Sequence, residues 1–157
     1  SNWPLFVPIM LLIAAFIGAC AGSTGGGIKV IRALILMRQG SSEITKLIHP
    51  NAVVTIKFGK RSLDPRVSES VWGFFAVYVA TFLIILMFLL SQNIDFLSAF
   101  SAVGATLNNL GPGLGIVAEN YKDISDGSKL ALCMAMLLGR LEIFTLLLIF
   151  TPSFWRN

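Results

Sequence analysis

Charged side chains are scarce in this sequence. Asp, Glu, Lys and Arg together make up 13% of the 157 residues, whereas hydrophobic residues make up 55%. Soluble domains carry about 25% charged residues, and disordered chains are much poorer in apolar residues. The composition therefore excludes disorder and argues against an ordinary soluble domain.

Cysteine and histidine are scarce too. Cys20 and Cys133 both lie in apolar segments, and His49 is the single histidine. These residues have neither the spacing of a metal site nor that of a disulfide framework. We expect both cysteines to be packing residues and His49 to be a helix cap or a surface residue. Because the sequence also shows no catalytic triad or pair of carboxylates, we expect no enzyme activity and no cofactor.

Long hydrophobic segments are what the sequence does have. Residues 71–90 are twenty uncharged residues, which at ~1.5 Å per residue span the ~30 Å hydrocarbon core of a bilayer. Residues 4–21 approach that length, and residues 130–154 form the last expected span. The chain enters its first apolar run at once, without an initiator methionine or a basic leader. We therefore expect no signal peptide and a fragment of a longer protein.

A glycine-rich stretch interrupts the first hydrophobic segment. Residues 22–27 (GSTGGG) separate residues 4–21 from residues 28–37, which are apolar apart from Lys29 and Arg32. Each glycine costs a helix about 1 kcal/mol, so four glycines within these six residues are expected to break it. The polar groups of a broken backbone are tolerated at membrane depth only where protein or a water-filled cavity surrounds them.

The charges are distributed unevenly along the chain. Residues 38–66 contain six Lys or Arg, whereas residues 91–126 contain four acidic residues and one lysine. Basic segments beside membrane spans stay in the cytoplasm. Residues 42–70 are therefore expected to form a basic cytoplasmic connector, and residues 91–126 to lie outside. The net charge of +4 indicates topology, and we expect no nucleic-acid partner.

Residues 96–107 are too short to cross a bilayer, because at ~1.5 Å per residue they reach only about 18 Å. The glycine-rich residues 108–115 that follow cannot continue the helix. We expect a half-helix that enters from outside and returns, with a buried helix and a surface turn as the alternative. The negative end of the half-helix would favour a cation, and the returning backbone would present carbonyl oxygens to it. The expected ion-facing residues are Asn109, Leu110, Gly111 and Pro112.

Four ordered motifs resemble the Trk/Ktr/HKT superfamily of potassium transporters, and most closely its Trk-type uptake subunits. The motifs are GACAGSTGGGIKVIR (18–32), LIHP (47–50), GATLNNLGPG (104–113) and GRLE (139–142). The resemblance implies an all-α integral membrane protein built from potassium-channel-like helix–pore loop–helix repeats, four to a subunit.

The resemblance also implies how the chain divides. Residues 1–41 would be the inner helix of the third repeat, broken by an intramembrane loop at residues 18–27. Residues 42–70 would be the connector, and residues 71–157 the complete fourth repeat. Because the first two repeats and the third filter are missing from this sequence, we expect that it does not enclose a pore by itself.

Particular residues acquire roles by the same resemblance. Asn109, Leu110 and Gly111 match the filter of the fourth repeat and would bind K⁺ as the transported ion. Arg140 matches a buried arginine of the last helix that contacts the gating loop. The gating loop would consist of Gly22, Ser23, Thr24, Gly25, Gly26 and Gly27.

Helix rise supports the contact between Arg140 and the gating loop independently. Arg140 and Gly18 lie ~18 Å and ~22 Å along their helices from the same side of the membrane. An arginine at mid-membrane costs at least ~2.5–3.5 kcal/mol, so it requires a partner such as the carbonyls that a helix break releases. Snorkelling to lipid or a purely structural pairing of Arg140 is the alternative.

Partners and location are also implied by the resemblance. Such a subunit would be surrounded by lipid in the cell inner (plasma) membrane, would cross it several times, and would pack against its own remaining repeats. It would form a homodimer and bind a cytosolic ring of nucleotide-binding regulatory subunits. The basic residues 38–66 offer the docking surface for that ring.

Three rival interpretations are open to the sequence. A nucleotide-binding enzyme is disfavoured, because residues 22–29 (GSTGGGIK) lack the Gly-Lys-Ser/Thr order of a phosphate loop and follow an apolar helix rather than a strand. A secondary transporter would share the broken helix but hold a small organic solute at the midplane. A structural membrane subunit without pore activity is the third. Selectivity for K⁺ over Na⁺, and channel-like against coupled transport, are open at this point.

Overall fold

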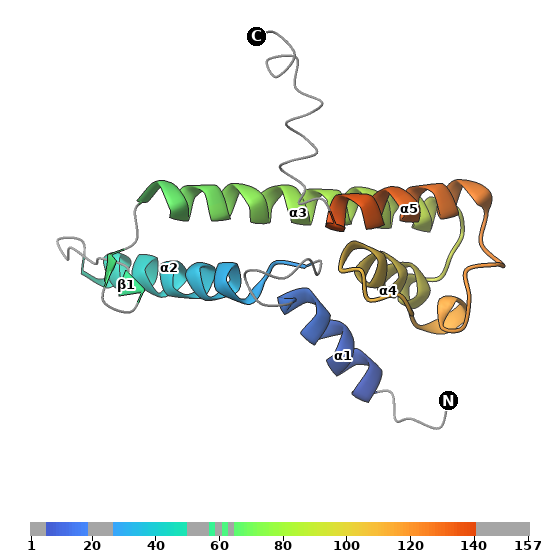
Figure 1. Cartoon of the computed structure of the whole chain (residues 1–157), viewed down its shortest axis with the longest axis horizontal. Helices are drawn as coiled ribbons and strands as arrows, with labels where there is room; N and C mark the ends of the chain where they lie inside the picture. Colours follow the sequence, from blue (N-terminus) through green and yellow to red (C-terminus); the bar gives the residue numbers. More distant parts are fainter. Residues whose placement is uncertain (1–5, 19–26, 50–56, 59–60, 63–64, 141–157) are drawn as a thin grey trace, which may run out of the picture.

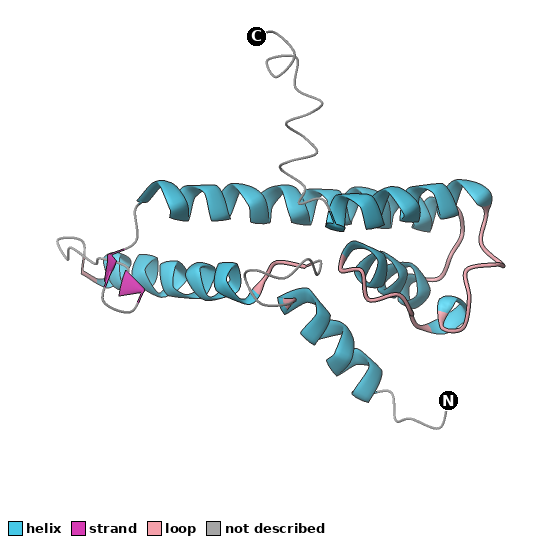
Figure 2. Ribbon diagram, viewed as in Figure 1, coloured by secondary structure: helices cyan, strands magenta, loops and turns pink. Residues whose placement is uncertain are grey.

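The computed structural model describes residues 6–18, 27–49, 57–58, 61–62 and 65–140 of the chain. These residues form helices and one small hairpin (Figures 1 and 2). In chain order the elements are α1 (Phe6–Ile17), α2 (Val30–Ile48), β1 (Lys57–Phe58), β2 (Arg61–Ser62), α3 (Pro65–Ser91), α4 (Phe96–Leu107), the 3-10 turn η1 (Gly115–Val117) and α5 (Asp126–Arg140). The expected all-α architecture is confirmed, apart from the antiparallel pairing of β1 with β2 in the connector.

α3 is the one helix in the described ranges that is long and apolar enough to cross a membrane. Its buried residues recur every three or four positions, which is the period of one helix face. They are Val71, Phe74, Tyr78, Phe82, Leu86 and Leu89. The opposite face is also apolar but exposed, as Leu83, Ile84 and Met87 show. Only 28% of the most apolar stretch of α3 is buried, which is typical of a helix that faces lipid and not of one in a soluble core.

Both helices beside the connector extend further than the sequence predicts. α2 continues to Ile48, through residues expected to belong to the connector. The hydroxyls of Ser41 and Thr45 donate to the carbonyls of Met37 and Ser41, four residues back, at 3.1 and 2.9 Å. Such bonds keep polar residues inside a helix. α3 already begins at Pro65, which suits a first turn because its missing N–H would have no partner there.

Figure 1 shows α3, α5 and α1 around α4, whereas α2 lies beside α3. α3 runs the length of the molecule, with α2 along one half of it and α4 along the other. α5 contacts both α3 and α4, and α1 contacts α4. Nine of the twelve residues of α4 are buried, and six of these nine are Ser, Ala or Gly, whose small size lets neighbouring backbones approach. α4 is therefore enclosed by protein, as a short helix within a membrane must be.

α5 packs so closely against the end of α4 that only glycine fits at position 139. A Cβ on Gly139 would meet the carbonyl oxygen of Leu107. One turn earlier on α5, the carbonyl of Met136 accepts a hydrogen bond from Asn109 Nδ2 (3.4 Å). These two contacts fix the end of α4 against α5.

Gly139→Ala is expected to destabilise the fold. The methyl group gains at most ~1 kcal/mol of helix propensity, but it forces two backbones apart, which costs about 1–3 kcal/mol. The measurement is thermal unfolding of the chain in detergent. Gly40→Ala is the matched control, because a Cβ at Gly40 in α2 meets no atom within 4 Å. A Gly139→Ala variant that unfolds at the same temperature as this control would contradict the close packing.

Candidate functional site

α4 ends in a Schellman motif. The N–H of Leu110 donates to the carbonyl of Ala105 (2.8 Å), and the N–H of Asn109 donates to the carbonyl of Thr106 (3.1 Å). This pair of bonds closes a helix whose next residue is left-handed. Asn109 is that residue, with φ +55°, and asparagine tolerates the conformation better than most residues. The chain therefore leaves the helix sharply, directly after the C-cap residue Asn108.

The carbonyl oxygens of residues 109–111 differ in whether they accept a hydrogen bond. That of Gly111 accepts a hydrogen bond from Tyr121 Oη (2.8 Å), whereas those of Asn109 and Leu110 accept none from the described part of the chain. All four residues from 109 to 112 are exposed. Gly111 takes φ +102°, a conformation that glycine adopts without strain. Two neighbouring carbonyls that have no donor among the described residues are suited to replace the hydration shell of a cation.

Two buried serines of α4 hold the returning chain. Ser101 Oγ accepts a hydrogen bond from the N–H of Leu114 (2.8 Å), and Ser98 Oγ accepts one from the N–H of Ile116 (3.0 Å). Both serines are completely buried and lie one helical turn apart. They accept hydrogen bonds from two backbone donors of the returning chain, which has no strand partner there. Two serines one turn apart in a largely apolar half-helix are the sequence signal for these bonds.

Tyr121, which lies in the predicted outer loop, holds residues 109–112 through its hydrogen bond to the carbonyl of Gly111. The tyrosine is half-buried, and this burial raises the pKa of its phenol above the ordinary value. The hydroxyl therefore keeps its proton at neutral pH and acts as the donor. Sequence reasoning missed Tyr121, because its partner is a backbone oxygen ten residues away.

The dipole of α4 also places a negative electrostatic potential at residues 109–112, which follow its C-terminus. At its N-terminus, Asp95 accepts a hydrogen bond from the N–H of Ser98 (3.0 Å), and hydrogen bonds from Ser98 hold the pKa of this carboxyl below its ordinary value. A negative cap suits the positive end of the helix. The last turn of α4 carries no basic residue, so its own side chains do not offset the negative end. The field favours a cation beside Asn109 and Leu110.

The predicted gate is described only at its final glycine. Gly27 is buried, has φ +88°, and lies against the side chain of Asn108. The N–H of Ile28 donates to the carbonyl of Phe16 (3.2 Å), so the chain on either side of the glycine-rich stretch is joined. The other predicted gate residues lie outside the described residues: Gly22, Ser23, Thr24, Gly25 and Gly26. The structure therefore brings the end of the predicted gate to Asn108, the residue directly before the predicted filter.

Arg140 lies at the end of the described part of the chain. It is the last described residue of α5 and is exposed in this chain. Successive helix residues point ~100° apart, and because Gly139 faces α4, Arg140 turns away from it. The loop that Arg140 was expected to contact, residues 22–26, lies outside the described residues, as does the rest of the predicted last span, residues 141–154.

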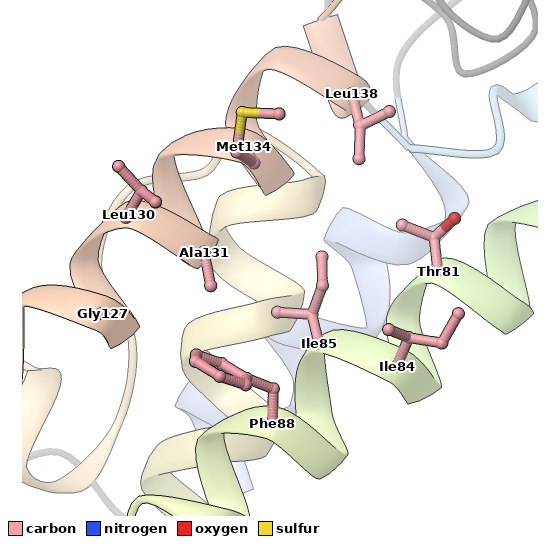
Figure 3. Close-up of a pocket in the computed structure, with 9 residues that line it drawn as sticks. All are labelled: Thr81, Ile84, Ile85, Phe88, Gly127, Leu130, Ala131, Met134 and Leu138. Carbon is pink, nitrogen blue, oxygen red and sulfur yellow. The ribbon is translucent and has the colours of Figure 1, made fainter.

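A separate groove lies between α3 and α5 (Figure 3). It has a volume of about 390 Å³ and a lining that is apolar except for Thr81. The hydroxyl of Thr81 already donates to the carbonyl of Val77 (2.8 Å). A solute site needs several convergent polar groups, so the groove gives no support to a secondary transporter of an organic solute. The described residues also contain no cluster of His, Cys, Asp and Glu that could hold a metal.

Known proteins similar to this chain are transporters. The Trk system potassium uptake proteins TrkH of Vibrio parahaemolyticus and Escherichia coli K12 are 56% and 54% identical to it, over 100% of this chain and 32% of each relative. A crystal structure of the potassium transporter TrkH from Vibrio parahaemolyticus matches with a TM-score of 0.89 and 56% identity, over 99% of this chain and 33% of that one.

These matches confirm the predicted fold and the resemblance. The chain spans about a third of the length of the curated relatives, at 32%. The family model described as "TrkH: Cation transport protein" matches residues 1–157, which is the whole sequence. The chain therefore belongs to the TrkH family of cation transport proteins.

Proposed function

We propose that the chain contributes one part of a transmembrane pathway for potassium uptake, in which the backbone of residues 109–112 binds the ion. The observation that carries this proposal is the pair of carbonyls at the exposed residues Asn109 and Leu110, which accept no hydrogen bond from the described part of the chain and lie at the negative end of α4. K⁺ is the ion that the names of the relatives support.

Binding a dehydrated K⁺ ion requires several oxygen ligands. Asn109 and Leu110 would supply two of them. Gly111 would supply a third, because a carbonyl oxygen has two lone pairs and Tyr121 occupies only one. Pro112 adds no N–H that would repel the ion. No cofactor is needed for this role.

One repeat supplies only one side of such a site, so the proposal requires the remaining repeats of the same subunit. We assign residues 1–41, with α1 and most of α2, to the inner helix of a third repeat. Residues 42–70 form the connector. Residues 71–157 form the fourth repeat, in which α4 is the pore helix between α3 and α5.

The pathway is tested by rubidium flux into liposomes. The protein is a chimera in which residues 1–157 replace the matching third of Escherichia coli TrkH. We expect K⁺ to compete with rubidium and Na⁺ to compete far less. Gly111→Ser is expected to reduce this selectivity about tenfold, because a side chain at φ +102° strains the backbone by about 1–3 kcal/mol.

The Gly111→Ser variant is expected to fold, since a Cβ at Gly111 meets no atom within 4 Å. Gly40→Ser is the matched control, because it also points into open space but lies in α2, far along the chain from the filter. Unchanged selectivity in Gly111→Ser would contradict the role of this stretch. A folded wild-type chimera without any cation flux would contradict the pathway itself and favour a solute transporter.

We further assign residues 22–27 and Arg140 to a gate below the filter, as the family resemblance implies. The position of Gly27 beside Asn108 supports this assignment. Arg140→Ala in the chimera is expected to change the open probability of the pathway, and an unchanged open probability would count against the gate.

The chain is part of a membrane transport subunit. We propose that this subunit crosses the inner membrane several times, forms a homodimer, and binds a cytosolic ring of nucleotide-binding regulatory subunits. The basic connector supports the ring as a partner. Charge reversal at Lys57, Lys60 and Arg61 is expected to weaken ring binding in a pull-down at low salt, where screening is weak. Binding equal to that of the wild type would defeat this assignment.

A further inference from the structure

Asn108 is held on several sides by other parts of the fold. It is the C-cap of α4 and is only 7% exposed. Its Nδ2 donates to the carbonyl of Gly104 (2.8 Å), and its Oδ1 accepts a hydrogen bond from Tyr78 Oη on α3 (2.7 Å). The residue that follows it, Asn109, begins the stretch that is proposed to bind the ion.

The chemistry of its partners fixes how the Asn108 amide is oriented. The carbonyl of Gly104 can only accept, so the NH₂ group of the amide must face it. The amide oxygen then faces Tyr78, whose hydroxyl is the donor. Both ends of the amide are therefore occupied, and a flipped amide would set two acceptors against each other at Gly104.

Packing fixes the position of Tyr78 in turn. The tyrosine is 3% exposed and stacks on Phe74, with ring centroids 6.2 Å apart and planes 28° apart. The guanidinium carbon of Arg32 lies 4.2 Å from the centroid of the Phe74 ring, a cation–π contact that joins α2 to α3. The hydroxyl of Tyr78 is thus presented to Asn108 by a ring with little freedom to move.

Gly27 closes the space around the same amide. A Cβ on Gly27 would lie 3.2 Å from Asn108 Oδ1, 3.1 Å from the Cα of Gly18 and 2.9 Å from the carbonyl oxygen of Ala15. The backbone at Gly27 therefore lies directly beside the Asn108 side chain and limits its rotation.

We propose that Tyr78 is a positioning residue for ion selectivity, which acts by holding the Asn108 amide and so sets the left-handed turn at Asn109 and the carbonyls after it. This inference rests on the proposed function of the stretch. Tyr78 does not reach the ion. It fixes the residue from which the ion-binding backbone starts, 30 positions away along the chain.

Tyr78→Phe is the first test, made in the chimera by rubidium flux with K⁺ and Na⁺ as competitors. The aromatic ring and its stacking on Phe74 are kept, but the buried oxygen of Asn108 loses its donor. We expect the K⁺ over Na⁺ selectivity to fall by about tenfold while total rubidium flux is kept. The unpaired oxygen of Asn108 lowers the stability of the fold without preventing folding.

Thr81→Val is the matched control. Thr81 lies on the same helix as Tyr78, and its hydroxyl donates to the carbonyl of Val77, not to the end of α4. We expect its selectivity to equal that of the wild type. An equal loss in both variants would mean that α3 acts through general packing, and this would overturn the specific role of Tyr78.

The double variant Tyr78→Phe, Asn108→Leu separates positioning from stability. Replacing both side chains leaves no unpaired side-chain oxygen or amide, and the carbonyl of Gly104 keeps the N–H of residue 108 as its donor (3.2 Å), so the cost to folding is smaller than in Tyr78→Phe alone. We expect the double variant to fold and to keep the reduced K⁺ over Na⁺ selectivity of Tyr78→Phe. Restored selectivity in it would overturn the proposal, and so would unchanged selectivity in Tyr78→Phe. Absence of cation flux in the wild-type chimera would instead refute the proposed function.

Discussion

The closure of α4 is the constraint on which the rest of the structure depends. Two hydrogen bonds, to the carbonyls of Ala105 and Thr106, end the helix within one turn and set Asn109 in the left-handed conformation. A helix that frayed gradually would point its last carbonyls along its axis and would not offer the next ones to an ion. α5 and α3 both contact this end, through Gly139 and Tyr78. The site thus takes its precision from how tightly the helix end is held.

A short helix and an irregular return can exist at membrane depth only under strict conditions. Every backbone donor needs a partner, since lipid supplies none. α4 meets the condition with small residues that let α5 approach closely, and with Ser98 and Ser101, which accept hydrogen bonds from the return. The surface that is left, with Asn109 and Leu110 exposed, is the one that remaining repeats would complete in a whole subunit.

The elements that the sequence predicts well are those that local signals define. The bounds of α4, Phe96–Leu107, are as expected, because an apolar run lies there between an acidic cap and two asparagines. The positive φ of Gly111 also follows from its place in a glycine- and proline-rich turn. α3 begins earlier than the expected residue 71, because hydropathy detects the part of a helix that faces lipid and not its polar first turns. The filter and gate roles stay predictions.

The features that could not be predicted from the sequence are those that depend on contacts between residues far apart in the chain. The bonds of Tyr78 to Asn108 and of Tyr121 to Gly111 join positions 30 and ten residues apart, and nothing in the local pattern of either tyrosine indicates them. The exposure of Arg140 follows from which face of α5 is buried, the face that carries Ser128, Leu132 and Ala135. The hairpin of β1 and β2 lies in a polar segment where periodicity gives no signal.

The most direct test of the account is to locate the ion itself. A crystal structure of the chimera grown with thallium, a strong anomalous scatterer that substitutes for K⁺, would show where the ion lies. The account predicts an anomalous peak within coordination distance of the carbonyl oxygens of Asn109 and Leu110, which competing K⁺ removes. A peak that lies elsewhere would contradict the claim that the closed end of α4 forms part of the ion pathway. So would a structure in which the carbonyls of these two residues accept hydrogen bonds from protein groups.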